Sequence, residues 1–158
     1  IDTLIYTVDR INSEIRNHKK QERLIEEVVL LQPTSPFRNN DDIDNAVKIF
    51  RDMDADSVIS CCAAPHPVQW YKYIDDDGVL RHLMPDENAS NNRQSIRQSY
   101  LPNGAIYIFK YSLLKETRTF YSNNTYPYLM PVSRSTDIDT LDDFKWAEFQ
   151  IQNNLNMN

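Results

Sequence analysis

Glycine is scarce in this sequence: Gly78 and Gly104 are the only two in 158 residues. A glycine-rich phosphate-binding loop needs several positions at which the backbone can approach a phosphate closely, so this chain alone cannot build one. An anionic substrate would therefore have to be held by other groups, such as a metal ion or local arginine side chains.

The chain also lacks long apolar runs, an excess of basic residues and separated cysteines. No stretch approaches the roughly 18 apolar residues that span a bilayer. A net charge of -6 argues against a general nucleic-acid-binding protein. Cys61 and Cys62 are adjacent, which suits reduced thiols in a cytoplasmic protein better than a disulfide. A composition of 41% hydrophobic and 25% charged residues is typical of a single packed domain.

The N-terminal residues IDTLIYTVDR contain neither an initiator methionine nor the basic start and apolar core of a signal peptide. This favours a chain that begins inside a longer gene product, so that residues 1–158 form one truncated domain. The spacing of Leu4, Val8, Ile11 and Ile15 predicts an amphipathic helix over residues 2–16 with one buried stripe.

Helical and strand patterns alternate after this first helix. The continuous apolar run EVVLLQ, residues 27–32, predicts a strand covered on both faces, as in a parallel sheet. A helix is expected over residues 40–50, with Asn40 as its N-cap. The apolar run DSVISCC, residues 56–62, predicts the next buried strand. This strand, helix and strand predict a crossover unit in an α/β fold with an open, mostly parallel sheet.

Residues 63–103 interrupt the α/β pattern. The Asp-Gly turn in YKYIDDDGVLRHL predicts an antiparallel hairpin, which would form an excursion from the main sheet. A strand at 105–110, a short helix at 112–116 and an extended segment at 126–132 follow. Thr140 and Asp143 then form a capping-box pattern ahead of a helix. The expected apolar face of this helix comprises Leu141, Phe144, Ala147 and Ile151.

Two carboxylates stand just before the last helix, in the segment STDIDTLDDF. Asp137 and Asp139 are two residues apart, so in an extended backbone both side chains project to the same face. Hard oxygen ligands in this arrangement suit Mg²⁺, which takes one or two protein carboxylates and leaves its other positions to waters and phosphates. The alternative is that both are solvated acids at a helix start.

The segment LLQPTSPFR places polar groups where the first predicted strand ends. Open α/β sheets bind ligands at the carboxyl ends of their strands, and two prolines fix the turn that holds Gln32, Thr34 and Ser35. The alternative is a rigid connection in which the hydroxyl groups only satisfy the backbone.

A third polar cluster precedes the strand at 105–110. Arg93 and Arg97 are four residues apart and could bind a carboxylate or phosphate, with Gln94 beside them. They could equally be an exposed basic face. Asn103 and Gly104 predict a turn that leads into the strand.

These motifs, in this order, resemble the cytidylyltransferases that activate sialic acid and related sugar acids. The resemblance rests on LLQPTSPFR, ADSVIS, APHPVQW, RQ, PNGAIYI and DIDT, and extends along the whole chain. It implies a nucleotide-binding α/β sheet and a homodimer formed through the excursion at residues 66–103. It also implies a reaction in which the anomeric hydroxyl of the sugar attacks the α-phosphate of CTP and releases pyrophosphate.

The resemblance also implies roles for individual residues. Asp137 and Asp139 match the metal-binding pair, which would hold Mg²⁺. Thr34, Ser35, Arg97, Asn103 and Gly104 would support the site. The positions expected around the sugar acid are Gln32, Arg93, Gln94, Tyr107, Phe120 and Tyr121.

Two departures from the family pattern keep other functions open. Leu101 stands where many members have an arginine just before PNGA, and the family's basic, glycine-containing nucleotide loop and its first strand are missing. A nucleotidyltransferase for another sugar or base is one alternative. A non-catalytic dimerisation or scaffold fragment is another, and it predicts no order around Asp137.

Overall fold

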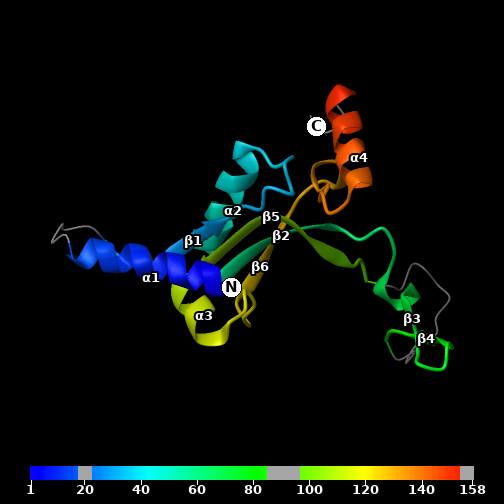
Figure 1. Cartoon of the computed structure of the whole chain (residues 1–158), viewed down its shortest axis with the longest axis horizontal. Helices are drawn as coiled ribbons and strands as arrows, with labels where there is room; N and C mark the ends of the chain where they lie inside the picture. Colours follow the sequence, from blue (N-terminus) through cyan, green and yellow to red (C-terminus); the bar gives the residue numbers. More distant parts are fainter. Residues whose placement is uncertain (18–22, 85–96, 154–158) are drawn as a thin grey trace.

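A computed structural model describes residues 1–17, 23–84 and 97–153. The helices are α1 (Asp2–Asn17), α2 (Asn40–Asp52), α3 (Tyr111–Thr117) and α4 (Leu141–Gln152), with short 3-10 turns η1 (Val68–Trp70) and η3 (Val132–Arg134). A four-stranded sheet contains β1 (Glu27–Leu30), β2 (Ser57–Ala63), β5 (Tyr100–Lys110) and β6 (Thr125–Leu129). A separate two-stranded sheet contains β3 (Lys72–Ile74) and β4 (Leu80–His82) (Figure 1).

The main sheet has the strand order β1-β5-β2-β6. β2 and β6 are parallel, whereas β5 runs antiparallel to both of its neighbours, β1 and β2. The predicted strand, helix and strand unit is confirmed as β1, α2 and β2, but the two strands are not adjacent because β5 lies between them. Three strands thus run in one direction around a single reversed strand, which places the ends of β1 and β2 at the same edge of the sheet.

β1 is more exposed than its continuous apolar run predicted. It forms an edge of the sheet among the described residues, with an alternating burial pattern and Val29 43% exposed. The expectation of a strand covered on both faces is wrong for β1 in this structure, because Val28 and Leu30 are half-buried on one face whereas Glu27 and Val29 are exposed on the other. The same expectation holds for β2, whose first four residues are all buried.

α2 packs on the sheet and supplies much of the core. Ala46 and Phe50 from α2 lie against Val58, Ile106 and Ile108 of the strands. The N-cap is Asn39, one residue before the predicted Asn40, because the Asn39 side chain accepts a hydrogen bond from the Asp42 amide. The Asp42 carboxylate in turn accepts one from the Asn39 amide and completes a capping box.

α1 lies beside α3 at the amino end of β1 (Figure 1). Val8 is buried and Leu4 and Ile15 are half-buried, as the predicted stripe requires, but Ile11 is 38% exposed. Asn12 occupies the stripe instead: its side chain both donates to and accepts from the backbone of Ile25. A polar residue can take this buried place because the chain entering β1 offers it two backbone partners.

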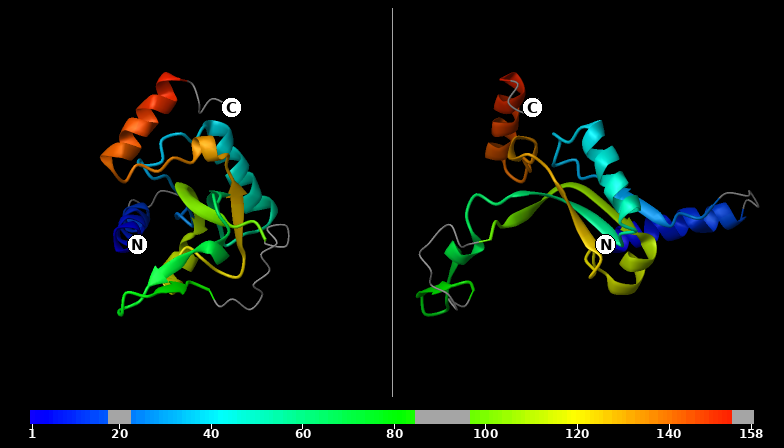
Figure 2. Two further views of the ribbon diagram at one scale, coloured as in Figure 1. Left: turned by 90° about the vertical axis from the view of Figure 1, so that its right-hand side faces the viewer. Right: turned by 180° about the vertical axis from the view of Figure 1, so that it is seen from behind.

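The predicted hairpin is confirmed as β3 and β4, joined by a turn in which Gly78 has a φ of +78°. It lies well apart from the main sheet, at the end of long extensions of β2 and β5 (Figure 2). We call the described residues of 66–84 and 97–102 the arm. Many apolar side chains of the arm are exposed, and they include Trp70, Tyr73, Ile74, Val79, Leu80, Leu83, Tyr100 and Leu101.

Asn103 and Gly104 do not form a turn before the strand, as predicted, but lie inside β5. The β2–β5 register shifts at this point, since Ile59 pairs with Tyr107 whereas Cys61 pairs with Pro102. β5 therefore carries an irregular bulge over residues 103–106, in which Gly104 takes a φ of +73°. The bulge bends β5 and turns the Asn103 side chain into the protein.

α4 has the predicted capping box of Thr140 and Asp143, but its expected apolar face is not buried. Leu141, Phe144 and Ile151 are exposed, and among the four expected residues only Ala147 is buried. The helix instead contacts the preceding loop through Ala147 and the polar Gln150. Helical periodicity predicted the position of α4 correctly. It did not predict the buried face, because hydrogen bonds from Gln150 to the loop determine which face of the helix packs.

Candidate functional site

The turn after β1 is rigid because Arg38 clamps it from within. One guanidinium nitrogen of Arg38, Nη1, donates to the carbonyl oxygens of Gln32 at 2.8 Å and Ser35 at 2.5 Å. The amide of Ser35 also donates to the Gln32 carbonyl. Ser35 is only 1% exposed, so its hydroxyl is directed into the protein and not to solvent.

Gly104 lies where three predicted site residues converge. A Cβ atom placed on Gly104 would be 2.5 Å from Gln32 Oε1, 2.7 Å from Ser35 Oγ and 3.4 Å from Asp137 Oδ2. Ser35 Oγ lies within hydrogen-bond distance of two acceptors that share its single proton, Asp137 Oδ1 at 3.2 Å and the Asn103 carbonyl oxygen at 3.0 Å. The bulge in β5 and the missing side chain at 104 together give an amide, a hydroxyl and a carboxylate room to meet.

Asn103 fixes the bulge through a buried hydrogen-bond network. Its Oδ1 accepts from Ser60 Oγ at 2.6 Å and from the Ala105 amide at 3.2 Å. Its Nδ2 donates to Ser135 Oγ at 2.8 Å, which connects β5 to the segment that carries Asp137. Asn103 therefore holds together three parts of the chain that are distant in sequence.

We expect replacement of Asn103 by leucine to lower the free energy of unfolding by about 1–3 kcal/mol, because the buried Ala105 amide loses its Asn103 acceptor and Ser60 loses one of its hydrogen bonds. Urea unfolding followed by circular dichroism measures this change. Asn153→Leu is the matched control, since Asn153 is exposed at the end of α4. Equal losses in the two variants would contradict a structural role for the Asn103 network.

Asp137 and Asp139 follow η3 and are attached to the turn after β1. The Ile138 amide between them donates to the Thr34 carbonyl at 2.8 Å. Asp137 is half-buried, whereas Asp139 is exposed. A cavity of about 480 Å³ opens beside Asp137, between this segment and α4, and Val132, Trp146 and Gln150 are among its lining residues. The region around Asp137 is therefore ordered, contrary to the scaffold alternative.

Within the described ranges, no three His, Cys, Asp or Glu side chains lie close enough to hold a metal ion. A cage built only of protein ligands is therefore absent from this part of the chain. Asp137 lies near Gly104, and Asp139 follows it two residues later at an exposed position. Carboxylate oxygens are ligands of the kind that Mg²⁺ takes when waters and substrate phosphates fill its other positions.

The predicted aromatic residues lie on the same side of β5. Phe120 packs against Tyr107 with ring centroids 5.3 Å apart and against Phe109 at 5.1 Å. Burial, together with nearby Tyr121 and the negative charge of Asp137, raises the pKa of Tyr107. Tyr107 is therefore a neutral hydroxyl group at neutral pH, able to donate a hydrogen bond close to Asp137, while Tyr121 is exposed.

The third polar cluster is only partly placed. Arg93 and Gln94 lie outside the described residues. Arg97 is exposed at the start of the returning chain. Gln98 next to it donates to the carbonyls of Ala64 and Ser99, and this fixes the base of the arm.

Sequence reasoning missed several residues that organise the site. Arg38 ends the LLQPTSPFR segment and had no predicted role. Asp42 was expected only as one of the acidic residues at the start of a helix. Ser60, Arg134 and Gln150 had no predicted role. One local signal could have indicated the role of Arg38: it stands three residues after Ser35, close enough to donate a hydrogen bond to the Ser35 carbonyl. The partners of the others are 14 to 92 residues away in sequence, so no local pattern indicates them.

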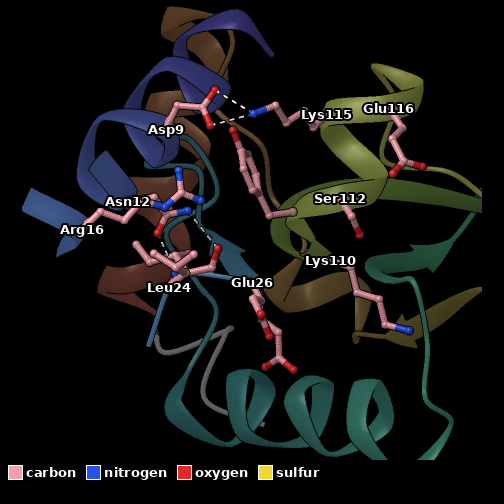
Figure 3. A pocket seen from close by; sticks show the side chains of 12 residues that line it. Asp9, Asn12, Arg16, Leu24, Glu26, Lys110, Ser112, Lys115 and Glu116 are labelled. Atoms are coloured by element: carbon pink, nitrogen blue, oxygen red, sulfur yellow. Dashed lines mark hydrogen bonds and ion pairs between the residues drawn. The ribbon is translucent and has the colours of Figure 1, made fainter. Parts of the chain in front are cut away.

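A second cavity, of about 530 Å³, lies at the opposite end of β1 and β5 from Gly104 (Figure 3). Its lining is strongly charged, and both of its lysines are paired with aspartates of the protein. Lys115 pairs with Asp9, and Lys110 with Asp54 and Asp56. Burial and a hydrogen bond to Asp9 raise the pKa of Tyr111 to about 12. This cavity contains none of the predicted site residues.

Cys61 and Cys62 are both free thiols, as expected, although they are half-buried and not fully buried. Burial and the neighbouring Cys62 raise the pKa of Cys61, so the thiol is protonated and unreactive at neutral pH. The described part of the chain contains no helix long and apolar enough to cross a membrane.

Known proteins similar to this chain are cytidylyltransferases. The chain is 32% identical over 119 residues to an N-acylneuraminate cytidylyltransferase of Streptococcus agalactiae serotype V. It is 38% identical over 124 residues to a CMP-N,N'-diacetyllegionaminic acid synthase of Legionella pneumophila. These alignments cover 75% and 77% of this chain, but only 29% and 52% of the respective relatives. No family model matches the chain.

The fold is also that of a nucleotidyltransferase. A solved CMP:2-keto-3-deoxy-manno-octonic acid synthetase complexed with CTP superposes with a TM-score of 0.55 at 12% identity, covering 93% of this chain and 68% of that protein. At this identity the likeness concerns the fold alone. The predicted α/β nucleotidyltransferase fold is confirmed, and so is the predicted resemblance. Over about three quarters of its length, the chain is similar to N-acylneuraminate cytidylyltransferases and related CMP-sugar synthases.

Proposed function

We propose that the complete gene product is a cytidylyltransferase that joins CTP and a sialic-acid-like nonulosonic acid into a CMP-sugar and pyrophosphate. The observation that carries this proposal is the convergence of Gln32, Ser35 and Asp137 on Gly104 at the end of β1. The activities for which the relatives are named supply the substrate class. The remaining nucleotide contacts would come from parts of the relatives that this chain does not span.

In the proposed reaction, the anomeric hydroxyl of the sugar acid attacks the α-phosphorus of CTP. A new P–O bond forms while the hydroxyl group loses its proton to water. The bond between the α-phosphorus and the oxygen bridging to the β-phosphate breaks, and pyrophosphate leaves with both electrons of that bond. Such a displacement depends mainly on alignment and on neutralising charge. Rigid polar groups suit it, and the turn clamped by Arg38 keeps the backbone from Gln32 to Ser35 in one conformation.

Asp137 and Asp139 would hold Mg²⁺ in this proposal. The ion would neutralise charge on the triphosphate, as metal ions do in phosphoryl transfer. Ser35 Oγ donates to Asp137 Oδ1 and leaves Oδ2, which lies on the Gly104 side, for another partner. The carboxylate is thereby oriented before any ligand binds.

The sugar acid would lie between Gln32 and the aromatic cluster of Tyr107, Phe120 and Tyr121. Gln32 Oε1 lies next to Gly104. Gly104 is part of the β5 bulge, which leads directly to Tyr107. Tyr107 would offer its neutral hydroxyl to the sugar. Arg93 and Gln94 stay in the proposal from the sequence resemblance, as ligands of the sugar carboxylate, with Arg97 and Asn103 in support.

The test uses the complete gene product with Mg²⁺, each of the four ribonucleoside triphosphates, and sialic, legionaminic and 2-keto-3-deoxyoctonic acids as acceptors. We expect pyrophosphate release with CTP and a nine-carbon sugar acid, and formation of the CMP-sugar identified by mass spectrometry. Equal turnover with UTP would favour the alternative of another base. No CMP-sugar from any of the three acids would contradict the proposed function.

We further propose that the arm makes a homodimer in the cytoplasm. A two-stranded hairpin is marginally stable alone in water, yet Ile74 and Leu80, which face each other in register, are 71% and 67% exposed. In a dimer with twofold symmetry, this surface would pack against the same surface of a second copy and so be removed from water. The arm's exposed aromatic residues are of the kind enriched in such interfaces.

We expect Leu80→Glu to halve the sedimenting mass of the complete gene product at tens of micromolar, a range suited to an interface of about micromolar affinity or tighter. The physical reason is the cost of burying a carboxylate in an apolar contact. Analytical ultracentrifugation measures the mass. Tyr6→Glu, at an exposed position on α1, is the control and should not change it. A monomeric wild-type protein under these conditions would contradict the dimer.

A further inference from the structure

The first turn of α2 contains a buried carboxylate that does more than cap the helix. Asp42 is 0% exposed. Its Oδ1 accepts hydrogen bonds from Arg134 Nη2 at 2.7 Å and from the Tyr128 hydroxyl at 2.9 Å. Its Oδ2 accepts from Arg134 Nε at 3.3 Å and from the Asn39 amide at 2.9 Å. A helix cap needs only the last of these contacts, so the other three require another explanation.

Stability alone does not explain a buried ion pair. Taking a carboxylate and a guanidinium out of water costs free energy that their attraction often only just recovers, and apolar residues of similar volume would serve as well. A pair of this kind can instead select one arrangement of the chain over others. The question is which arrangement the Asp42–Arg134 pair selects.

Arg134 belongs to the loop that carries Asp137. The loop leaves β6 at Leu129, forms η3 through Arg134, and reaches Asp137 three residues later. Its backbone makes few hydrogen bonds to the main sheet, and side chains from other elements hold it. Asp42 holds Arg134 from α2, Asn103 holds Ser135 from β5, and Gln150 of α4 holds Ser133 and Thr136.

The other half of the site is anchored at the same end of α2. Arg38 precedes the N-cap Asn39 and clamps the carbonyls of Gln32 and Ser35. The start of α2 therefore holds the turn after β1 on one side and the loop before α4 on the other. The two halves meet where the Ile138 amide donates to the Thr34 carbonyl and Ser35 donates to Asp137.

We propose that Asp42 is a positioning residue: through Arg134 it fixes the loop of residues 131–139 so that Asp137 stays in register with Gln32 and Ser35. Asp42 contacts none of the groups assigned to the substrates, and acts only through Arg134. The proposal rests on the proposed function insofar as Asp137 is the working carboxylate. The mechanical part, that Asp42 holds the loop in place, is independent of the reaction.

The electrostatic setting of Asp42 supports this role. Burial opposes its ionisation, but the hydrogen bonds from Arg134, the Asn39 amide and Tyr128 outweigh burial and hold the pKa of Asp42 below its usual value. The carboxylate is therefore charged throughout the neutral range. Arg134, which is itself largely buried, remains paired under the same conditions.

The experiment compares hydrogen exchange and kinetics in the complete gene product. Asp42→Asn keeps the size and the capping oxygen but removes the charge that holds Arg134. We expect amide exchange in a peptide covering residues 135–139, measured by mass spectrometry without substrates, to be about tenfold faster, because local opening of the loop then costs less free energy. We expect the apparent KM for Mg²⁺ to rise by about the same factor.

Leu114→Ala is the matched control for general destabilisation. Leu114 is fully buried in α3, at the other end of β5 from the site. Compared at temperatures equally far below their melting points, Leu114→Ala should leave exchange in residues 135–139 and the KM for Mg²⁺ close to wild type. The same change in both variants would show that Asp42 acts only through overall stability, and would overturn the proposal.

Tyr128→Phe provides a second variant if Asp42→Asn fails to fold. It removes one hydrogen bond to Asp42 and keeps the ion pair, so exchange in residues 135–139 should accelerate less but in the same direction. Unchanged exchange in a folded Asp42→Asn protein, or in Tyr128→Phe where Asp42→Asn does not fold, would overturn the positioning role. Accelerated exchange in a protein that makes no CMP-sugar would support the role while contradicting the proposed function.

Discussion

Replacement of Asp137 or Asp139 by asparagine should reduce CMP-sugar formation by the complete gene product more than about a hundredfold, because even the outer partners of metal ligands are worth about 10–100-fold. The reason lies in the ligand count. Two carboxylates give Mg²⁺ few protein contacts, so the loss of either leaves the triphosphate poorly neutralised. Steady-state kinetics at saturating CTP and varied Mg²⁺ measure the effect.

The fold should survive both substitutions. Asp139 is exposed, and asparagine at 137 keeps an oxygen that can accept the hydrogen bond from Ser35. Melting temperatures should therefore stay close to wild type while activity falls. Asp142→Asn is the matched control, because Asp142 lies in the same acidic segment with its side chain 90% exposed. Near-wild-type activity of Asp139→Asn at limiting Mg²⁺ would exclude the proposed metal role for this residue.

Gly104→Ala should lower both stability and activity, for two separable reasons. The first is conformational: an alanine at a φ of +73° is held in the left-handed region, which costs about 1–2 kcal/mol. The second is steric, since the new methyl group would lie 2.5 Å from Gln32 Oε1 and 2.7 Å from Ser35 Oγ. Gln32 can swing away, but buried Ser35 is held by Asn103 and Asp137.

Gly78→Ala separates the two effects. Gly78 has nearly the same conformation, with a φ of +78°, but nothing lies within 4 Å of the position a Cβ would take. We expect Gly78→Ala to show the conformational cost alone, and Gly104→Ala to lose about 1–3 kcal/mol more from overpacking. Urea unfolding measures the difference, and CMP-sugar formation should fall sharply only in Gly104→Ala. If Gly78→Ala and Gly104→Ala lost the same stability and kept the same activity, the space around a methyl group at position 104 would not be crowded.

Part of the site was predictable because its signals are local. Proline spacing in the LLQPTSPFR segment indicated a rigid polar turn, and Arg38 holds this turn in the structure. The pair Asp137 and Asp139 indicated oxygen ligands for a metal ion, and that role stays a prediction. The sequence indicated an unusual backbone conformation at Gly104, because the residue is glycine. It did not indicate that Gly104 lies inside β5. A dipeptide such as Asn-Gly predicts a turn equally well whether the chain reverses there or only bulges, and pairing with β2 decides between these.

Other features had no local signal at all. The acidic residues after Asn39 were expected as helix-start charges, and Asp41 and Asp42 look alike in sequence. Only Asp42 is buried, because α2 packs with that side toward β6 and places it against Arg134, 92 residues later. In the same way, Gln150 is buried in α4 while Phe144 and Ile151 are exposed, the reverse of what side-chain polarity predicts.

The sequence by itself determined the order of helices and strands, the hairpin of the arm, the capping box of α4, and the family resemblance through a series of ordered motifs. These are properties of short segments, for which backbone propensity, side-chain periodicity and turn chemistry are sufficient. Only the tertiary structure decided that β5 lies between β1 and β2, that its bulge opens a space at Gly104, and that the start of α2 holds both halves of the site. Each of these depends on contacts between distant segments, and such contacts are set by the packing of the whole sheet.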